Sequence, residues 1–320
     1  MDWQAEITAA DHRIDPHIRR TPVMAVDNLI PGLDLALKLE HLQHTGSFKP
    51  RGAFNSLLTT AVPQAGVVAA SGGNHGAAVA YAAKSLGHDC TIFIPETASP
   101  SKIEMIRRSG VEPIITDGVY ANALNAAATF EADHGSMSIH AYDDVGTVCG
   151  QGTVMREWEA QGLDADTILI AVGGGGLIAG AMAWLGGRRK LVAVEPETAC
   201  ALHAALAAGT PVDVEVSGVA ASALGASRLG DICFGLASDL ASDVASDVHS
   251  DLDNKQQIET VLVSDRAITA AQRSLWQNLR MAVEPGGAAT IAALMSGAYR
   301  PQQGERVAAL LCGANVDINF

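Results

Sequence analysis

One lysine stands in a segment whose residue types suit covalent chemistry. Lys49 lies in the run Ser-Phe-Lys-Pro-Arg-Gly at residues 47–52, directly after the aromatic residue Phe48. A lysine that forms a Schiff base must be a neutral amine for part of its cycle, and a partly dry, apolar pocket lowers its pKa toward that state. The alternative interpretation is a solvated surface lysine, because fully buried lysine is rare. Two further motifs favour the chemical interpretation.

A second segment has the composition of an anion-binding turn. Residues 71–76 are Ser-Gly-Gly-Asn-His-Gly, between the apolar run 67–70, which predicts a buried strand, and the alanine-rich run 77–83, which predicts a helix. Backbone N–H groups at a helix N-terminus suit an anion such as a substrate carboxylate. Asn74 both donates and accepts hydrogen bonds, so it suits a phenolic oxygen on a cofactor ring. The alternative is an ordinary strand-to-helix turn, where these residue types are common.

A third segment consists of four consecutive glycines at 173–176, between the predicted strand 167–172 and the predicted apolar helix 178–185. Glycines let backbone amides approach a phosphate without obstruction by side chains. The rival pattern is the Gly-x-Gly-x-x-Gly loop of dinucleotide-binding proteins, but the sixth position of that pattern is Ile178. Glu195, about 20 residues further on, keeps a nicotinamide cofactor open as an alternative.

Together these motifs resemble those of fold-type II pyridoxal-phosphate enzymes, and among them the serine/threonine dehydratases and serine racemases. Two more motifs occur in the family's order, Gly-Gln-Gly-Thr at 150–153 and Cys-Gly-Ala-Asn-Val-Asp at 312–317. The resemblance implies an α/β fold with two domains, similar to tryptophan synthase β, in which helices flank parallel sheets. It assigns residues 1–65 and 143–320 to a large cofactor-binding domain and residues 66–142 to a small inserted domain.

The resemblance also implies roles for single residues. Lys49 is expected to form the Schiff base with pyridoxal 5'-phosphate and to act as the catalytic base. The expected cofactor-binding residues are Phe48, Lys49, Asn74, Gly173, Gly174, Gly175, Gly176, Leu177 and Cys312. Cys312 is expected to face the pyridine nitrogen. The expected substrate-binding residues, around the substrate carboxylate, are Ser71, Gly73, Asn74 and His75.

Some relatives bind a divalent cation through a Glu, a backbone carbonyl and an Asp. Glu195 and the carbonyl of Ala199 match two of these ligands in position, but the third position is Ala201. Hard cations prefer six or more oxygen ligands, which a lost carboxylate makes harder to supply. The alternative is that Glu195 is an ordinary carboxylate at the end of a strand.

The activity that the resemblance implies is β-elimination from a hydroxy-amino acid such as L-threonine, L-serine or 3-hydroxyaspartate, which gives a 2-oxo acid and ammonia. The first alternative is an amino-acid racemase. Serine racemases carry a second serine where this chain has Gly72, which has no proton to give. The remote alternative is a non-catalytic ligand-binding relative. Because the sequence ends at Phe320, soon after the last motif, we expect no C-terminal regulatory domain and favour a role in amino-acid catabolism.

The composition agrees with this class. The chain has 320 residues and is 48% hydrophobic, which allows a sizeable core. A net charge of −14 argues against binding to nucleic acid or to an anionic membrane surface. No apolar run is long enough to span a membrane, and the first residues lack the features of a signal peptide. Five cysteines without a Cys-x-x-Cys pair indicate reduced thiols in a cytoplasmic protein. The resemblance adds the expectation of a homodimer.

Strands and helices alternate along the middle of the chain. Apolar runs predict strands at 91–95, 112–116 and 138–141, with helices at 101–109 and 120–134. This alternation predicts parallel sheets covered by helices.

Residues 237–253 form an acidic repeat of four residues, Ala-Ser-Asp followed by Leu or Val with small variations. On a helix its aspartates would repel one another at i,i+4, at a cost of a few tenths of a kcal/mol per pair. We interpret the segment as an inserted acidic surface helix or loop. The alternative is a partner surface or a lid.

Overall fold

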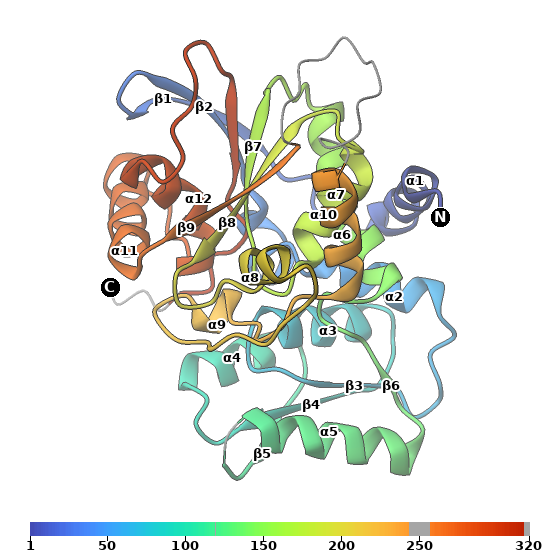
Figure 1. Ribbon diagram of the computed structural model, residues 1–320. Helices are drawn as coiled ribbons and strands as arrows, with labels where there is room; N and C mark the ends of the chain where they lie inside the picture. The colour runs from blue at the N-terminus through green and yellow to red at the C-terminus, as the bar shows by residue number, and fades with distance from the viewer. Residues whose placement is uncertain (119, 243–256, 317–320) are drawn as a thin grey trace.

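We describe the protein from a computed structural model, in which residues 1–118, 120–242 and 257–316 are described. Figure 1 shows two sheets in separate halves of the molecule, each flanked by helices. Within the ranges just given, no helix is both long enough and apolar enough to cross a membrane.

The six-stranded sheet, called the large sheet below, has the order β1-β2-β10-β7-β8-β9. Its strands are β1 (Val23–Ile30), β2 (Leu33–Lys38), β10 (Val307–Leu310), β7 (Thr167–Ala171), β8 (Lys190–Pro196) and β9 (Ile258–Val263). β1 and β2 pair antiparallel, and the other neighbours pair parallel. Every residue of β7 and of β10 is buried, as expected of a parallel strand covered on both faces.

Helices cover both faces of the large sheet. Figure 1 shows α11 and α12 on one side of it and α6, α7 and α10 on the other. The helices of this half are α1 (Trp3–Ile14), α2 (Pro50–Thr59), α6 (Val145–Ala160), α7 (Gly176–Leu185), α8 (Ala201–Ala208), α9 (Ala221–Leu224), α10 (Asp231–Ser242), α11 (Asp265–Ser274) and α12 (Pro285–Ser296). Shorter helical turns are η1 (Asp15–His17), η2 (Glu40–Leu42), η3 (His44–Gly46) and the π-helical turn η4 (Leu275–Leu279).

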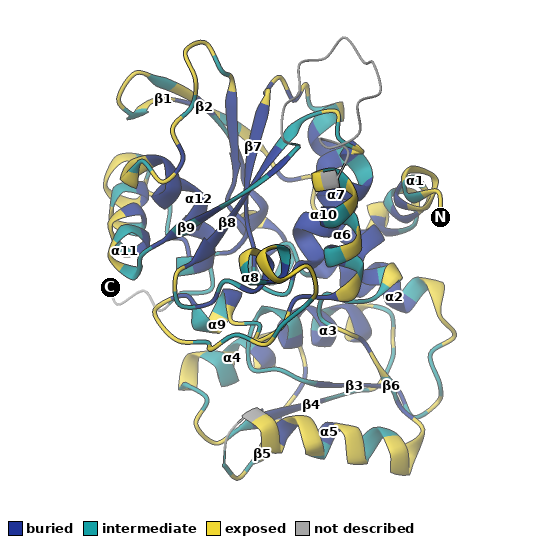
Figure 2. Ribbon diagram, in the orientation of Figure 1, coloured by how far each residue is buried: buried dark blue, intermediate teal, exposed yellow. Residues whose placement is uncertain are grey.

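The four-stranded sheet, called the small sheet, is parallel throughout and has the order β5-β4-β3-β6. Its strands are β5 (Ile114–Thr116), β4 (Cys90–Pro95), β3 (Val67–Ala70) and β6 (Met137–Ser138), and its helices are α3 (Asn74–Ser85), α4 (Pro100–Arg108) and α5 (Tyr120–His134). α3 lies on the side of the large sheet, and α5 covers the opposite face with its own outer side exposed (Figures 1 and 2).

The predicted α/β architecture with parallel sheets flanked by helices is confirmed. The strand predicted at 138–141 is wrong in extent, because only Met137 and Ser138 belong to β6. The next residues contact the candidate site instead: the carbonyl of Ile139 accepts a hydrogen bond from His75, and that of Ala141 accepts one from Lys49.

Two further predictions concern the division into domains and the acidic repeat. All four strands of the small sheet lie between residues 66 and 142, but the division into domains stays a prediction. In the acidic repeat, residues 237–242 belong to the end of α10, and residues 243–253 lie outside the described residues.

Candidate active site

Lys49 lies at the start of α2, where it occupies the N-cap position before Pro50. Its Nζ donates a hydrogen bond to the carbonyl oxygen of Ala141 at 2.7 Å and lies 5.1 Å from the centre of the Phe48 ring. Burial lowers the pKa of Lys49 to about 8, although the carboxylate of Glu284 raises it. The amine therefore loses its proton more readily than an ordinary lysine, as a Schiff-base lysine requires.

The four glycines form the turn between β7 and α7. Gly175 is the N-cap of α7 with a φ of +99°, which lies in the left-handed region that favours glycine. A Cβ atom on Gly174 would stand 2.3 Å from the Tyr142 ring, so a side chain there would collide with it. The turn thus has no room for a side chain at Gly174. Its backbone N–H groups at the start of α7 suit a phosphate.

The structure brings the predicted cofactor-binding residues together. One pocket is lined by all of them: Phe48, Lys49, Asn74, Gly173, Gly174, Gly175, Gly176, Leu177 and Cys312. The Lys49 amine, the Phe48 ring and the glycine turn therefore share one pocket. These residues fit a pyridoxal group with its phosphate.

The turn after β3 has the form that the sequence predicts. Ser71 Oγ accepts a hydrogen bond from the N–H of Gly73 at 3.2 Å, and Gly73 is the N-cap of α3. The ring of His75 donates to the carbonyl of Ile139 at 3.0 Å. Burial, and next the charge of Lys49, lower the pKa of His75 to about 3, so its imidazole is neutral. Ser71 and His75 shape the turn.

A second, more open cleft adjoins the pocket at Asn74. Gly73 and Asn74 line this cleft together with Lys102 of α4 and Asn315. Of the predicted substrate-binding residues, Gly73 and Asn74 are the ones that line the cleft.

Glu284 is a site residue that the sequence analysis missed. It is the N-cap of α12, is 4% exposed and lines both the pocket and the cleft. Asn74 Nδ2 donates to Glu284 Oε1 at 2.6 Å, and Asn315 Nδ2 donates to Asn74 Oδ1 at 2.6 Å. Burial raises the pKa of Glu284 to about 7, although Asn74 and Lys49 lower it. The signal in the sequence was a Glu before Pro-Gly-Gly at the start of an apolar helix.

Cys312 lies beyond the carboxyl end of β10, next to the lysine segment. Its backbone oxygen accepts a hydrogen bond from the N–H of Phe48 at 3.2 Å. The side chain is buried, and burial raises the pKa of the thiol, so it remains a neutral thiol. A neutral thiol donates or accepts only a weak hydrogen bond.

Glu195 has a structural partner at the end of β8. Its two carboxylate oxygens accept hydrogen bonds from the backbone N–H groups of Leu202 and His203, both at 2.8 Å, in the first turn of α8. Burial raises the pKa of Glu195 to about 7. Among the described residues, no group of three or more His, Cys, Asp or Glu side chains is placed to hold a metal ion. The cation site at Glu195 and Ala199 stays a prediction, and a cation there would share both oxygens with these amides.

The fold and the site define an α/β protein with a pocket at the carboxyl ends of parallel strands, where a lysine lies beside a glycine turn suited to a phosphate. Comparison with protein families narrows this class. Residues 14–313 match the family described as "Pyridoxal-phosphate dependent enzyme", and the chain belongs to that family. The cofactor of its enzymes is pyridoxal 5'-phosphate.

Individual relatives cover nearly the whole chain. Phenylserine dehydratase of Ralstonia pickettii is 33% identical over 95% of this chain and 90% of its own length. Serine racemase of Arabidopsis thaliana is 33% identical over 98% of this chain and 92% of its own length. The crystal structure of a threonine deaminase from the organism abbreviated T.th. superposes with a TM-score of 0.86 at 33% identity, covering 99% of both chains.

Proposed function

We propose that this protein is a pyridoxal-phosphate-dependent ammonia-lyase that removes water from a hydroxy-amino acid and releases a 2-oxo acid and ammonia. The observation that carries the proposal is the placement of the Lys49 amine, the glycine turn and Cys312 in one pocket. The dehydratase and deaminase among the relatives support this reaction class. The candidate substrates are L-threonine, L-serine, 3-hydroxyaspartate and bulkier β-hydroxy amino acids.

The pocket residues would hold the cofactor in distinct ways. The N–H groups of residues 173–176 would bind the phosphate, Asn74 the phenolic oxygen of the ring, and the Cys312 thiol the pyridine nitrogen. When bound, pyridoxal phosphate supplies an electron sink for the electron pair left at Cα. A neutral thiol does not force the pyridine nitrogen to stay protonated as a carboxylate would, which favours loss of the β-hydroxyl over a long-lived carbanion.

Lys49 would act as the general base. Its pKa of about 8 leaves part of the amine neutral near neutral pH, so that it takes the proton from the substrate's Cα. The N-terminus of α3, with the turn Ser71 to His75, would hold the substrate carboxylate. His75 stays neutral and so would orient the turn without carrying protons.

The decisive variant is Lys49→Ala. We expect it to fold, to bind the cofactor only non-covalently, and to lose turnover by several orders of magnitude, because it lacks both the anchoring amine and the base. The measurement is release of 2-oxo acid across the candidate substrates, with borohydride trapping of cofactor on the protein. Lys84→Ala, at an exposed position of α3, is the matched control. A Lys49→Ala variant with about a tenth of the wild-type turnover would refute the assignment.

Racemisation is the second candidate function, because serine racemases are equally similar in sequence. It needs a proton donor on each face of the substrate carbanion, and Gly72 supplies none. A Cβ atom on Gly72 would meet Ile94 at 3.5 Å and Lys102 at 3.8 Å, so Gly72→Ser fits with ordinary contacts. We expect this variant to raise the ratio of D-amino acid to 2-oxo acid, measured by chiral chromatography. Comparable amounts of both products from the unaltered protein would favour the racemase.

We further propose a cytoplasmic homodimer. All five cysteines are free in the structure, in keeping with a reducing compartment, and the family resemblance supports a dimer. Light scattering coupled to gel filtration tests the dimer, and the mass of a single 33.1 kDa chain would contradict it.

A further inference from the structure

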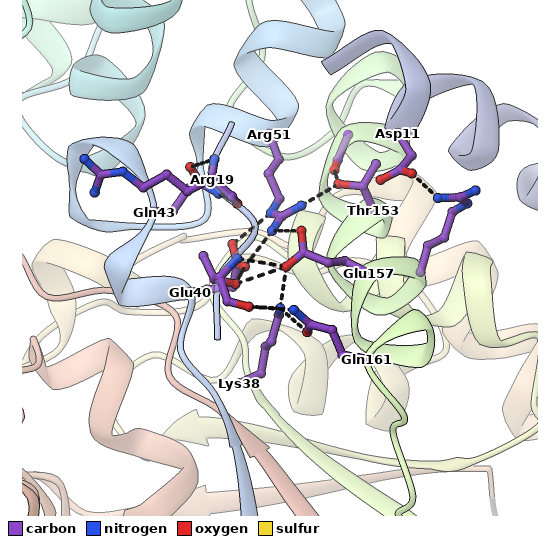
Figure 3. Close-up of polar contacts among 12 residues, drawn as sticks. Asp11, Arg19, Lys38, Glu40, Gln43, Arg51, Thr153, Glu157 and Gln161 are labelled. Atoms are coloured by element: carbon purple, nitrogen blue, oxygen red, sulfur yellow. Dashed lines mark hydrogen bonds and ion pairs between the residues drawn. The ribbon is translucent and has the colours of Figure 1, made fainter. Parts of the chain in front are cut away.

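A buried network of two cations and two carboxylates lies beside the start of α2 (Figure 3). Lys38, Glu40 and Arg51 are 0% exposed, and Glu157 is 9% exposed. Arg51 Nε and Nη2 donate to the two oxygens of Glu40 at 2.9 and 2.8 Å, and Nη2 also donates to Glu157 at 2.8 Å. Lys38 Nζ donates to the other oxygen of Glu157 at 2.5 Å. The four charges balance one another within the protein.

Lys49 lies between Glu40 and Arg51 in the sequence. Glu40 begins η2, and Arg51 is the second residue of α2. The guanidinium makes a bidentate hydrogen bond to both oxygens of Glu40, so it holds the two ends of the segment 40–51 together. Within that loop, the N–H of Arg51 donates to the carbonyl of Phe48 at 3.1 Å. The pair therefore fixes the second residue of α2 relative to η2, and Lys49 lies directly before this helix.

The same network reaches the hydrogen-bond partner of Lys49. Arg51 contacts two residues of α6, since its Nη1 donates to Thr153 Oγ1 at 3.2 Å and its Nη2 to Glu157. Ala141, whose carbonyl accepts the Lys49 hydrogen bond, lies four residues before the start of α6 at Val145. Arg51 thus fixes the position of α2 relative to α6. In this way it also fixes the position of Lys49 relative to the carbonyl of Ala141.

Stability alone does not require this ion pair. Replacing a buried ion pair by apolar side chains of similar volume is often neutral or stabilising, because burying charge carries a desolvation penalty. Burial works against the charged form of Arg51, but Glu40 and Glu157 together raise its pKa, so the guanidinium stays charged. The geometry that the pair imposes is therefore its distinctive contribution.

We infer that the Glu40–Arg51 pair is a positioning device, which holds the Lys49 amine in its desolvated place in the pocket. The inference rests on the proposed function only in taking Lys49 as the reacting amine. It predicts that loosening the pair moves the amine toward water without unfolding the protein.

The test is the double variant Glu40→Leu with Arg51→Met, in the full chain. It removes one positive and one negative charge and leaves Lys38 paired with Glu157. We expect the Tm to change by less than about 5 °C. We expect the pH at which Lys49 reacts half-maximally with an amine-directed reagent to rise by about one unit, since a solvated ammonium is harder to deprotonate. In the loaded enzyme, kcat should fall about 100-fold while KM changes much less, because a small displacement of a reacting group costs about that much.

The matched control is Asp11→Leu with Arg156→Met. This partly buried ion pair joins α1 to α6 and does not flank Lys49. It should leave both the labelling profile of Lys49 and kcat near wild type. If the first double variant does not fold, Arg51→Lys replaces it. An ammonium keeps the positive charge but cannot make the bidentate hydrogen bond to Glu40.

A folded variant whose Lys49 labelling profile and kcat match wild type overturns the inference. Labelling needs no turnover, so a protein without ammonia-lyase activity would refute the proposed function and still allow this test. A change in kcat without any change in labelling would show that the pair acts elsewhere.

Discussion

At the scale of single residues, the site pairs an amine and a carboxyl that burial drives toward their neutral forms. Burial brings the pKa of Lys49 down to about 8 and that of Glu284 up to about 7. Each group favours the charged form of the other. A proton can therefore leave or enter this pair near neutral pH, which suits general acid–base chemistry.

The first consequence concerns the pH dependence of Lys49 itself. An amine-directed reagent attacks only the neutral amine, whose fraction rises as the pH increases through the pKa. We expect half-maximal labelling of Lys49 near pH 8 in the cofactor-free chain. A single-lysine peptide, with a pKa of about 10.4, is the control. Peptide mass spectrometry measures both, and a Lys49 curve that overlays the peptide would contradict a desolvated amine.

Glu284→Gln separates the charge of this residue from its hydrogen bond. The amide oxygen of glutamine still accepts from Asn74, but the negative charge that raises the pKa of Lys49 is gone. We expect half-maximal labelling of Lys49 to move below pH 8, with the chain still folded. Glu112→Gln, on the surface of the small-sheet half, should leave the curve in place. An upward movement in Glu284→Gln would show that our account of this carboxyl is wrong.

At the scale of elements, four helices begin at the site. Their N-cap residues are Lys49 for α2, Gly73 for α3, Gly175 for α7 and Glu284 for α12. A helix N-terminus carries a partial positive charge, so the convergence of four of them favours anions. A phosphate and a carboxylate are the two anions that the proposed reaction brings to this place.

Gly175→Ala tests whether the glycine turn needs its backbone conformation and its space. A Cβ atom there would lie 2.5 Å from Cys233 Sγ, and its φ is +99°. Gly209→Ala is the control, because Gly209 also has a positive φ, +69°, but nothing within 4 Å of the added atom. The control should cost roughly 1–2 kcal/mol of unfolding free energy. We expect Gly175→Ala to cost more and to weaken cofactor binding at least about tenfold, measured by urea unfolding and absorbance titration. Equal effects of the two variants on unfolding free energy and cofactor binding would show that Gly175 has no special role in the turn.

The elements around the glycine-rich turns could be predicted from the sequence, because their signals are local. The strands β3, β4 and β7 are short apolar runs between turns, and the helices after β3 and β7 begin at glycine-rich turns. Glu284 could not be assigned in this way, since its role depends on Asn74, 210 residues away in the chain. The predicted end of β6 was wrong for the same reason. Contacts of the residues after Ser138 with Lys49 and His75 override a local strand preference.

At the scale of the whole molecule, the site ties the two sheets to each other. Asn74 begins a helix of the small-sheet half and bonds to Glu284 and Asn315 of the other half. The Lys49–Ala141 hydrogen bond is a second tie. A substrate bound at Asn74 would therefore contact both halves.

Asn315→Ala removes one of these ties. Asn315 also donates to the carbonyl of Thr45 at 2.8 Å, so it anchors Asn74 to the lysine segment. We expect KM for the amino acid to rise about tenfold and kcat to stay within about threefold, because Asn74 remains but is less well ordered. Steady-state kinetics measures this, and Asn278→Ala, at an exposed position of η4, is the control. An unchanged KM would show that Asn315 does not order the substrate site.

The place of β10 in the large sheet has a consequence for the order of folding. β10 is the last strand in the described chain, yet it pairs with β2 on one side and β7 on the other. β2 and β7 are not neighbours, so a chain made only as far as α12 holds the large sheet in two separate pieces. The small sheet, by contrast, uses only strands between Val67 and Ser138 and can assemble early from nearby contacts. Joining of the two pieces by β10 would then be a late, long-range step that also delivers Cys312 to Lys49, so the protein would gain its chemistry only when its slowest contacts form.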